Sequence, residues 1–165
     1  MAQDAREIFI TGLRNAHAME TQAREMMERQ SERLDEYPDV KARITAHLHE
    51  TETQLKRLDE CLASVGESSS TLKDTTQSLM GNMAALAHTV MPDEILKNTF
   101  ANNAFEHFEI AAYKSLLSLA DLAGMSAAKP LLQASLKEEE AMAAWIDQNI
   151  DNVTRSYVRV AQATA

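Results

Sequence analysis

Residues 105–116 read FEHFEIAAYKSL, and they place two carboxylates on the apolar side of a predicted helix. At 3.6 residues per turn, Phe105, Glu109 and Leu116 line up on one face, and Glu106 lies one turn before Glu109. Glutamate is rarely buried without a partner, because an unpaired buried carboxylate costs several kcal/mol. Two glutamates on the inner face of a helix therefore indicate either a solvated border or a cation that both of them bind.

The composition of the whole chain favours an all-α protein. Hydrophobic residues make up 45% of the 165 residues, whereas Gly and Pro number only 4 and 3. These are too few for a turn-rich β protein, and the abundant Ala, Leu, Met, Glu and Gln favour helices. The length suits a single domain over residues 1–165, with its core at about 4–150 and a C-terminal tail at 151–165.

Four breaks divide the helical pattern. Pro38 and Pro92 mark two of them, since proline lacks the N–H donor and disfavours helix in the residue before it. Gly66 and Gly124 mark the others and suit the position just after a helix C-terminus. The predicted long helices cover about 4–36, 39–65, 93–123 and 127–150, and a shorter helical stretch covers about 72–90.

The order of these helices predicts the topology. The first two long helices form one tightly joined pair and the last two form another. The connection between the pairs is a long crossover that carries the additional short helix. This is the ferritin-like topology of a four-helix bundle, and it is the fold that we predict.

Every long helix carries a glutamate on or beside its apolar stripe. A single such glutamate is ordinarily a solvated flank residue, but four of them, one per helix, indicate a shared cation. Carboxylate oxygens suit iron, manganese or similar ions, and a bundle interior can hold two of them. The candidate carboxylates are Glu20, Glu50, Glu106, Glu109 and Glu139, with Glu138 beside the last.

Two histidines lie one turn before two of these glutamates. His17 precedes Glu20, and His47 precedes Glu50. We interpret both histidines as residues that hydrogen-bond behind the ligands or elsewhere in the bundle, and the alternative is that they are additional ligands.

Charge and cysteine content exclude several functions. Sixteen Lys and Arg against 25 Asp and Glu give a formal charge of −9, which argues against binding to nucleic acid or to anionic membranes. Cys61 is the only cysteine, so the chain can form no internal disulfide and no thiolate zinc site. The N-terminus lacks the pattern of a signal peptide, and no stretch has the length of a membrane span. We therefore expect a cytoplasmic protein.

Five motifs carry a resemblance to a known family. They are L-x-x-A-x-x-M-E-x-Q at 13–22, H-x-x-E-T-x-x-Q-x-x-R-L at 47–58, L-K-D at 72–74, F-E-x-x-E-I-A-A-Y at 105–113 and L-x-E-E at 136–139. With these motifs the sequence resembles the YciE/YciF family of bacterial ferritin-like proteins. The resemblance implies a dinuclear iron or manganese site, an association with stress responses and a homodimer. The ligands that it implies are Glu20, Glu50, Glu106, Glu109 and Glu139, with His17, His47 and Glu138 as extra or outer residues.

The sequence departs from the better-known di-iron pattern, in which E-x-x-H occurs on the second and fourth long helices. Glu50 is followed at that spacing by Thr53 and Glu139 by Met142, and no histidine follows His107. Two functions therefore stay open. One is a metal site that handles peroxide or iron, as a peroxide-consuming or ferroxidase-like oxidoreductase. The other is a degenerate, dimeric structural or interaction protein that holds a structural ion or no metal.

Overall fold

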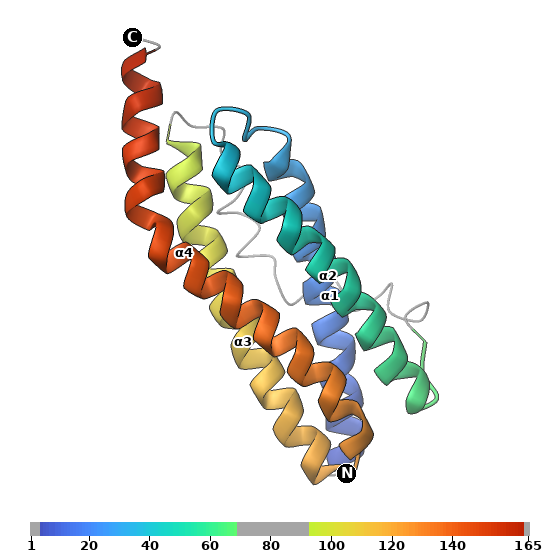
Figure 1. Cartoon of the computed structure of the whole chain (residues 1–165). Helices are drawn as coiled ribbons and strands as arrows, with labels where there is room; N and C mark the ends of the chain where they lie inside the picture. The colour runs from blue at the N-terminus through green and yellow to red at the C-terminus, as the bar shows by residue number, and fades with distance from the viewer. Residues whose placement is uncertain (1–3, 69–92, 164–165) are drawn as a thin grey trace.

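The computed structural model describes residues 4–68 and 93–163, and these fold almost entirely into helices (Figure 1). No strand occurs within those two ranges. The helices confirm the all-α prediction, whereas the predicted short helix at 72–90 lies outside the described residues. The elements are α1 (Ala5–Ser31), α2 (Pro38–Ser64), α3 (Glu94–Leu122), the 3-10 helix η3 (Ser126–Ala128) and α4 (Lys129–Ala163).

The four long helices pack as a bundle. Helix α1 lies against α2 and α3, and α4 lies against the same two helices. Figure 1 shows that α1 and α2 are antiparallel, as are α3 and α4, whereas α2 and α3 run in the same direction. The end of α2 and the start of α3 therefore lie at opposite ends of the bundle. This arrangement confirms the ferritin-like topology with its long crossover.

Two helix boundaries differ from the prediction. Helix α1 ends at Ser31 rather than near residue 36, and the chain reverses over the turn that holds the buried Leu34. The reversal needs several residues, and Pro38 then occupies the first turn of α2, where a missing N–H costs nothing. Helix α4 continues through the predicted tail to Ala163, because residues 151–163 contain neither Gly nor Pro. Its last turns project beyond the other helices (Figure 1).

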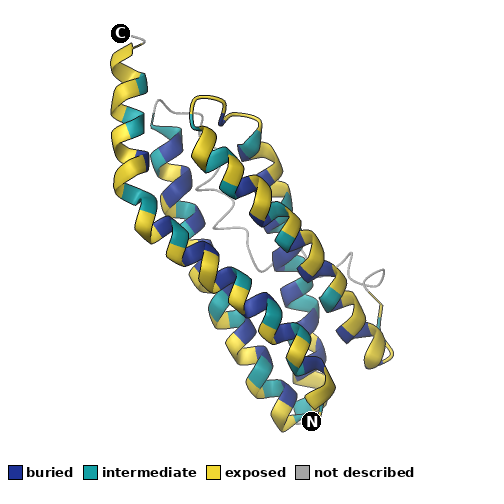
Figure 2. Cartoon of the chain, in the orientation of Figure 1, coloured by how far each residue is buried: buried dark blue, intermediate teal, exposed yellow. Residues whose placement is uncertain are grey.

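Buried side chains occupy the facing sides of the helices, and exposed ones occupy the outside (Figure 2). No helix of the described part has the length and apolar character that crossing a membrane requires.

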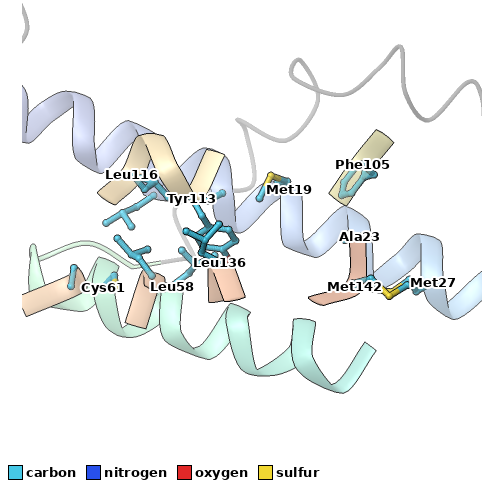
Figure 3. Close-up of a cluster of buried hydrophobic side chains, with 14 of the residues drawn as sticks. Met19, Ala23, Met27, Leu58, Cys61, Phe105, Tyr113, Leu116, Leu136 and Met142 are labelled. Atoms are coloured by element: carbon cyan, nitrogen blue, oxygen red, sulfur yellow. The ribbon is translucent and has the colours of Figure 1, made fainter. Parts of the chain in front are cut away.

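The apolar core is one cluster of buried side chains, which we divide into two groups along the bundle axis with Met19 between them (Figure 3). Polar residues separate these two groups along the helices. In α1, Glu20 precedes Ala23, and in α4, Glu139 lies between Leu136 and Met142. One group contains Leu58, Cys61, Leu116 and Leu136 around Tyr113, and the other contains Ala23, Met27, Phe105 and Met142.

A pair of buried amides connects α1 to α3 beyond the second apolar group. Gln30 Nε2 donates to Asn102 Oδ1 at 3.1 Å, and Asn102 Nδ2 donates back to Gln30 Oε1 at 2.9 Å. The two side chains are 4% and 6% exposed. Each amide thus satisfies the other, which makes their burial tolerable.

Candidate metal centre

Four ionisable side chains meet between the two apolar groups. They come from α2, α3 and α4, and each offers a ligand atom within 4.8 Å of those of the other three. All four residues are buried. Glu106 and Glu109 reach the same point because residues three apart lie on one face of a helix. The group, hereafter the His47 group, consists of His47, Glu106, Glu109 and Glu139.

His47 is the one imidazole in this group, and the other three members are carboxylic acids. Its Nε2 lies 3.3 Å from Oε2 of Glu106 and 3.4 Å from Oε2 of Glu139. On the other side of the ring, Nδ1 lies 2.7 Å from Oε2 of Glu50. Because Glu50 contacts Nδ1, the ring is held with Nε2 directed at the carboxylates.

Glu50 lies behind His47 and outside the His47 group. Its carboxylate also accepts a hydrogen bond from Arg43 at 3.2 Å, and its side chain is 32% exposed. Arg43 and His47 together hold the pKa of Glu50 below its usual value, against the opposing effect of partial burial. Glu50 is thus an anion that orients the imidazole.

Glu20 approaches the group from α1 and is completely buried. Its Oε1 accepts a hydrogen bond of 2.6 Å from the hydroxyl of Tyr113. Burial, and then the charge of Glu139, raises the pKa of Glu20 well above its usual value. The four helices therefore bring four glutamates and one histidine into one region of the interior.

Burial also governs the protonation of the other members. It raises the pKa of Glu109 well above its usual value, and the neighbouring Glu20, Glu139 and Glu106 add to the effect. It raises the pKa of Glu106 to about 8, although His47 opposes the shift. For His47, burial alone would lower the pKa, but the contacts with Glu106, Glu139 and Glu50 raise it to about 12.

Most of the carboxylate oxygens of Glu20, Glu106, Glu109 and Glu139 lack a hydrogen-bond donor. Among residues 4–68 and 93–163, no donor satisfies five of them. A buried acceptor without a partner costs roughly 1–3 kcal/mol, and a single imidazole cannot satisfy five. Carboxylate oxygens with one imidazole nitrogen are a donor set that suits iron or manganese, so these residues fit the predicted metal. The five are Oε2 of Glu20, Oε2 of Glu106, Oε1 of Glu109 and both oxygens of Glu139.

Two other candidates have partners away from the His47 group. The Glu138 carboxylate accepts from both terminal nitrogens of Arg57, at 2.6 and 2.8 Å, and from Gln54 Nε2 at 3.0 Å. His17 lies at the bundle surface, where Nε2 is 3.2 Å from Oδ1 of Asp59. Neither residue offers a ligand atom to the group.

Sequence reasoning left His47 as an outer residue or an additional ligand and took Glu50 as a ligand. The structure places His47 inside the group and Glu50 behind it. A signal for this placement exists in the sequence. His47 lies three residues after the buried Ile44 and four before the buried Thr51, on the inner stripe of α2.

A bundle of two antiparallel helix pairs around a buried histidine–carboxylate cluster defines a ferritin-like helical protein with a candidate metal centre. The chain belongs to the family described as "Domain of unknown function (DUF892)", whose model matches residues 4–159.

Named relatives agree with this assignment. Protein YciF of Escherichia coli K12 is 32% identical over 107 residues, which are 58% of this chain and 60% of YciF. The predicted relationship to the YciE/YciF family is thus confirmed. The alignment thus spans about three fifths of the length of YciF.

Three solved structures have the same fold. A protein of Xanthomonas campestris pv. campestris superposes with a TM-score of 0.80 at 29% identity, covering 96% of this chain and 99% of that one. The E. coli stress protein YciF gives a TM-score of 0.76 at 22% identity over 93% and 99% of the two chains. YcfI of Rhodopseudomonas palustris gives 0.73 at 24% identity over 88% and 94%.

Proposed function

We propose that this protein binds two ions of iron or manganese between its four helices. The observation that carries the proposal is the set of five buried carboxylate oxygens without donors around His47. His47, Glu106, Glu109, Glu139 and Glu20 are the proposed ligands. This set replaces Glu50 with His47 as the ligand from α2.

The surrounding residues have supporting roles in this proposal. Glu50 orients the His47 ring, and Tyr113 fixes one oxygen of Glu20 so that the other stays available. The two apolar groups exclude water, which strengthens the attraction between carboxylates and a cation. Bound iron or manganese would supply redox chemistry towards peroxide or dioxygen.

The biological role that we propose is the handling of peroxide or iron under stress. It is supported by the likeness to YciF, which is described as a stress protein, and by the chemistry of the ligand set. We further propose that the protein works in the cytoplasm as a homodimer, as the family resemblance implies.

The test is metal content after chelation and anaerobic reloading with Fe²⁺ or Mn²⁺, measured by elemental analysis. We expect about two ions per chain, as in other dinuclear bundles. The variant Glu139→Gln should lose most of the metal, because it removes a ligand oxygen charge without changing the shape of the side chain. Glu140→Gln is the matched control, since Glu140 is the next residue and its side chain is 47% exposed beside Lys114. Less than a tenth of an ion per reloaded wild-type chain would refute the proposal.

A metal-free structural role is the second candidate, and one observation favours it. A protonated His47, with its pKa raised to about 12, could compensate part of the carboxylate charge while Glu20 and Glu109 stay neutral. Under this alternative, reloading leaves both the metal content and the melting temperature unchanged.

A further inference from the structure

Gln54 on α2 is completely buried and has a fixed orientation. Its Nε2 donates to Oε2 of Glu138, and both terminal nitrogens of Arg57 bind the same carboxylate. An ionised carboxylate only accepts hydrogen bonds, so the NH₂ end of the amide must face Glu138. The amide oxygen of Gln54 is therefore directed away from Glu138.

That oxygen has no donor within the described ranges, although it is buried. The contrast with Gln30 is direct, because both ends of that equally buried amide are satisfied by Asn102. An amide oxygen is a neutral ligand for hard cations, and a buried one without a donor is suited to that role.

Thr51, on the same face of α2, shows the same deficiency. A helical threonine commonly donates to the carbonyl four residues earlier. Thr51 is 1% exposed, and in the described chain its Oγ1 has no partner at all. The threonines that do bond to the residue four positions back are Thr11, Thr21, Thr53, Thr99 and Thr154.

The helix register places Gln54 on the same side of the His47 group as Glu20, and Thr51 lies one turn before Gln54. Helices α2 and α3 are parallel (Figure 1), and His47 contacts Glu106, so these two residues lie at one level. Seven residues further along each helix, about two turns, come Gln54 and Tyr113. The Tyr113 hydroxyl binds Glu20, so Gln54 and Glu20 lie on the same side of the His47 group.

We propose that Gln54 and Thr51 complete a second cation subsite with Glu20, next to the His47 group. The inference rests on the proposed function and specifies how α2 serves it: through His47, Thr51 and Gln54 this helix contributes only neutral ligands. Glu109 and Glu139 interact with Glu20 as well as with the rest of the His47 group, so both would be available to either ion.

Charge balance gives the class of cation. Four buried carboxylates carry four negative charges, which two divalent ions neutralise. They are Glu20, Glu106, Glu109 and Glu139. A net charge in a low-dielectric interior is costly, so the neutral amide of Gln54 favours a divalent ion over a trivalent one.

The test is the number of ions bound by Gln54→Leu, measured by elemental analysis and by titration calorimetry with Mn²⁺. We expect the content to fall from about two ions per chain to about one, since the His47 group remains intact. Gln30→Leu is the matched control, because it makes the same substitution at the other buried amide. It should keep both ions.

Melting temperatures of the metal-free forms separate loss of a ligand from loss of structure. Gln54→Leu removes the unsatisfied oxygen together with the Nε2 donor to Glu138, which Arg57 still binds with both terminal nitrogens, so the melting temperature should change little. Gln30→Leu leaves the Asn102 amide without its partner and should lower the melting temperature more. Thr51→Val, which preserves shape, is the second variant, and we expect it to weaken one of the two Mn²⁺ binding steps.

The outcomes distinguish this inference from the proposed function. If both Gln54→Leu and Thr51→Val bind two ions with unchanged affinity, the second subsite is overturned. The proposed role of the His47 group is unaffected by that outcome. One ion in the wild type, retained in Gln54→Leu, overturns the second subsite in the same way. No ion in the wild type overturns the proposed function, and the subsite with it.

Discussion

Tyr113 and Glu20, which lie on different helices and are both fully buried, are joined by a hydrogen bond of 2.6 Å. Tyr113→Phe removes the only donor that reaches Glu20 Oε1 among the described residues. We expect a loss of about 1–3 kcal/mol in the free energy of unfolding of the metal-free protein, measured in urea. Tyr157→Phe near the end of α4, where the side chain is only partly buried, is the control and should change stability by less than about 0.5 kcal/mol. Equal effects of the two substitutions would contradict the role given to this bond.

The stability of the metal-free protein should fall as the pH rises. The pKa of Glu106 is raised to about 8 and that of His47 to about 12, so the folded state keeps protons that the unfolded chain has lost. The stability that each group contributes in this way is fully present below its pKa in the unfolded chain. It is lost as the pH rises through its pKa in the folded protein. For each retained proton, the slope is about 1.4 kcal/mol per pH unit.

Metal loading should reverse this trend. The carboxyl groups must lose their protons to bind a cation, so metal affinity increases with pH. Melting temperatures between about pH 5 and pH 9, with and without Mn²⁺, measure both slopes. Parallel curves for the two forms would mean that the added ion does not bind at these groups.

Glu109→Gln separates the requirements of stability from those of metal binding. The amide has the shape of the protonated carboxyl and cannot ionise, so the metal-free variant should lose stability less steeply as the pH rises. It should also bind less metal, because the charge of one proposed ligand is missing. The measurement is urea unfolding at two pH values, with metal content on the same samples. A variant that binds as much metal as the wild type would exclude Glu109 as a ligand.

The different roles of His47 and Glu50 can be separated by binding measurements. Glu50→Ala removes the contact with Nδ1 but no ligand, so we expect the number of ions to persist with an affinity about 10–100-fold lower. His47→Ala should eliminate one ion. If Glu50→Ala instead eliminates an ion and His47→Ala only weakens binding, the roles that we assign are reversed.

Cys61 should be inert in the folded protein. The thiol is 2% exposed, and burial, with a smaller effect of Glu60, raises its pKa to about 11. Because the thiolate is the reactive form, we expect no reaction with a thiol reagent at pH 8 and full reaction once the chain is unfolded in guanidinium. Rapid labelling of the native protein would show that this part of the core opens.

The fold and most of the site could be predicted because both follow from periodicity. The 3.6-residue repeat identified four helices and placed Glu20, Glu109 and Glu139 on their inner faces. For His47 and Glu50 the same periodicity favours His47 as the inward residue, but by a small angle. Three helical positions differ by 300°, so the two residues lie only 60° apart around α2, on either side of the boundary between interior and solvent.

Which of the two residues faces inward depends on the rotation of α2 about its own axis. That rotation is set by the packing of α2 against its two neighbouring helices, and the stripe of Ile44, His47 and Thr51 indicates it only coarsely. The end of α1 at Ser31 could not be predicted for a related reason. The length of the turn depends on how the chain must approach α2, and helix propensity alone does not determine it.

The reciprocal amide pair of Gln30 and Asn102 opposes axial sliding of α1 along α3. A one-turn slip of α1 along α3 would disrupt the packing of their side chains and would leave all four polar atoms of this pair without partners. The same slip would carry Glu20 about 5 Å away from Tyr113, since one turn of helix rises by that length. The pair thus adds to helix packing and to the Tyr113–Glu20 bond in favouring the axial alignment in which the acidic cluster forms.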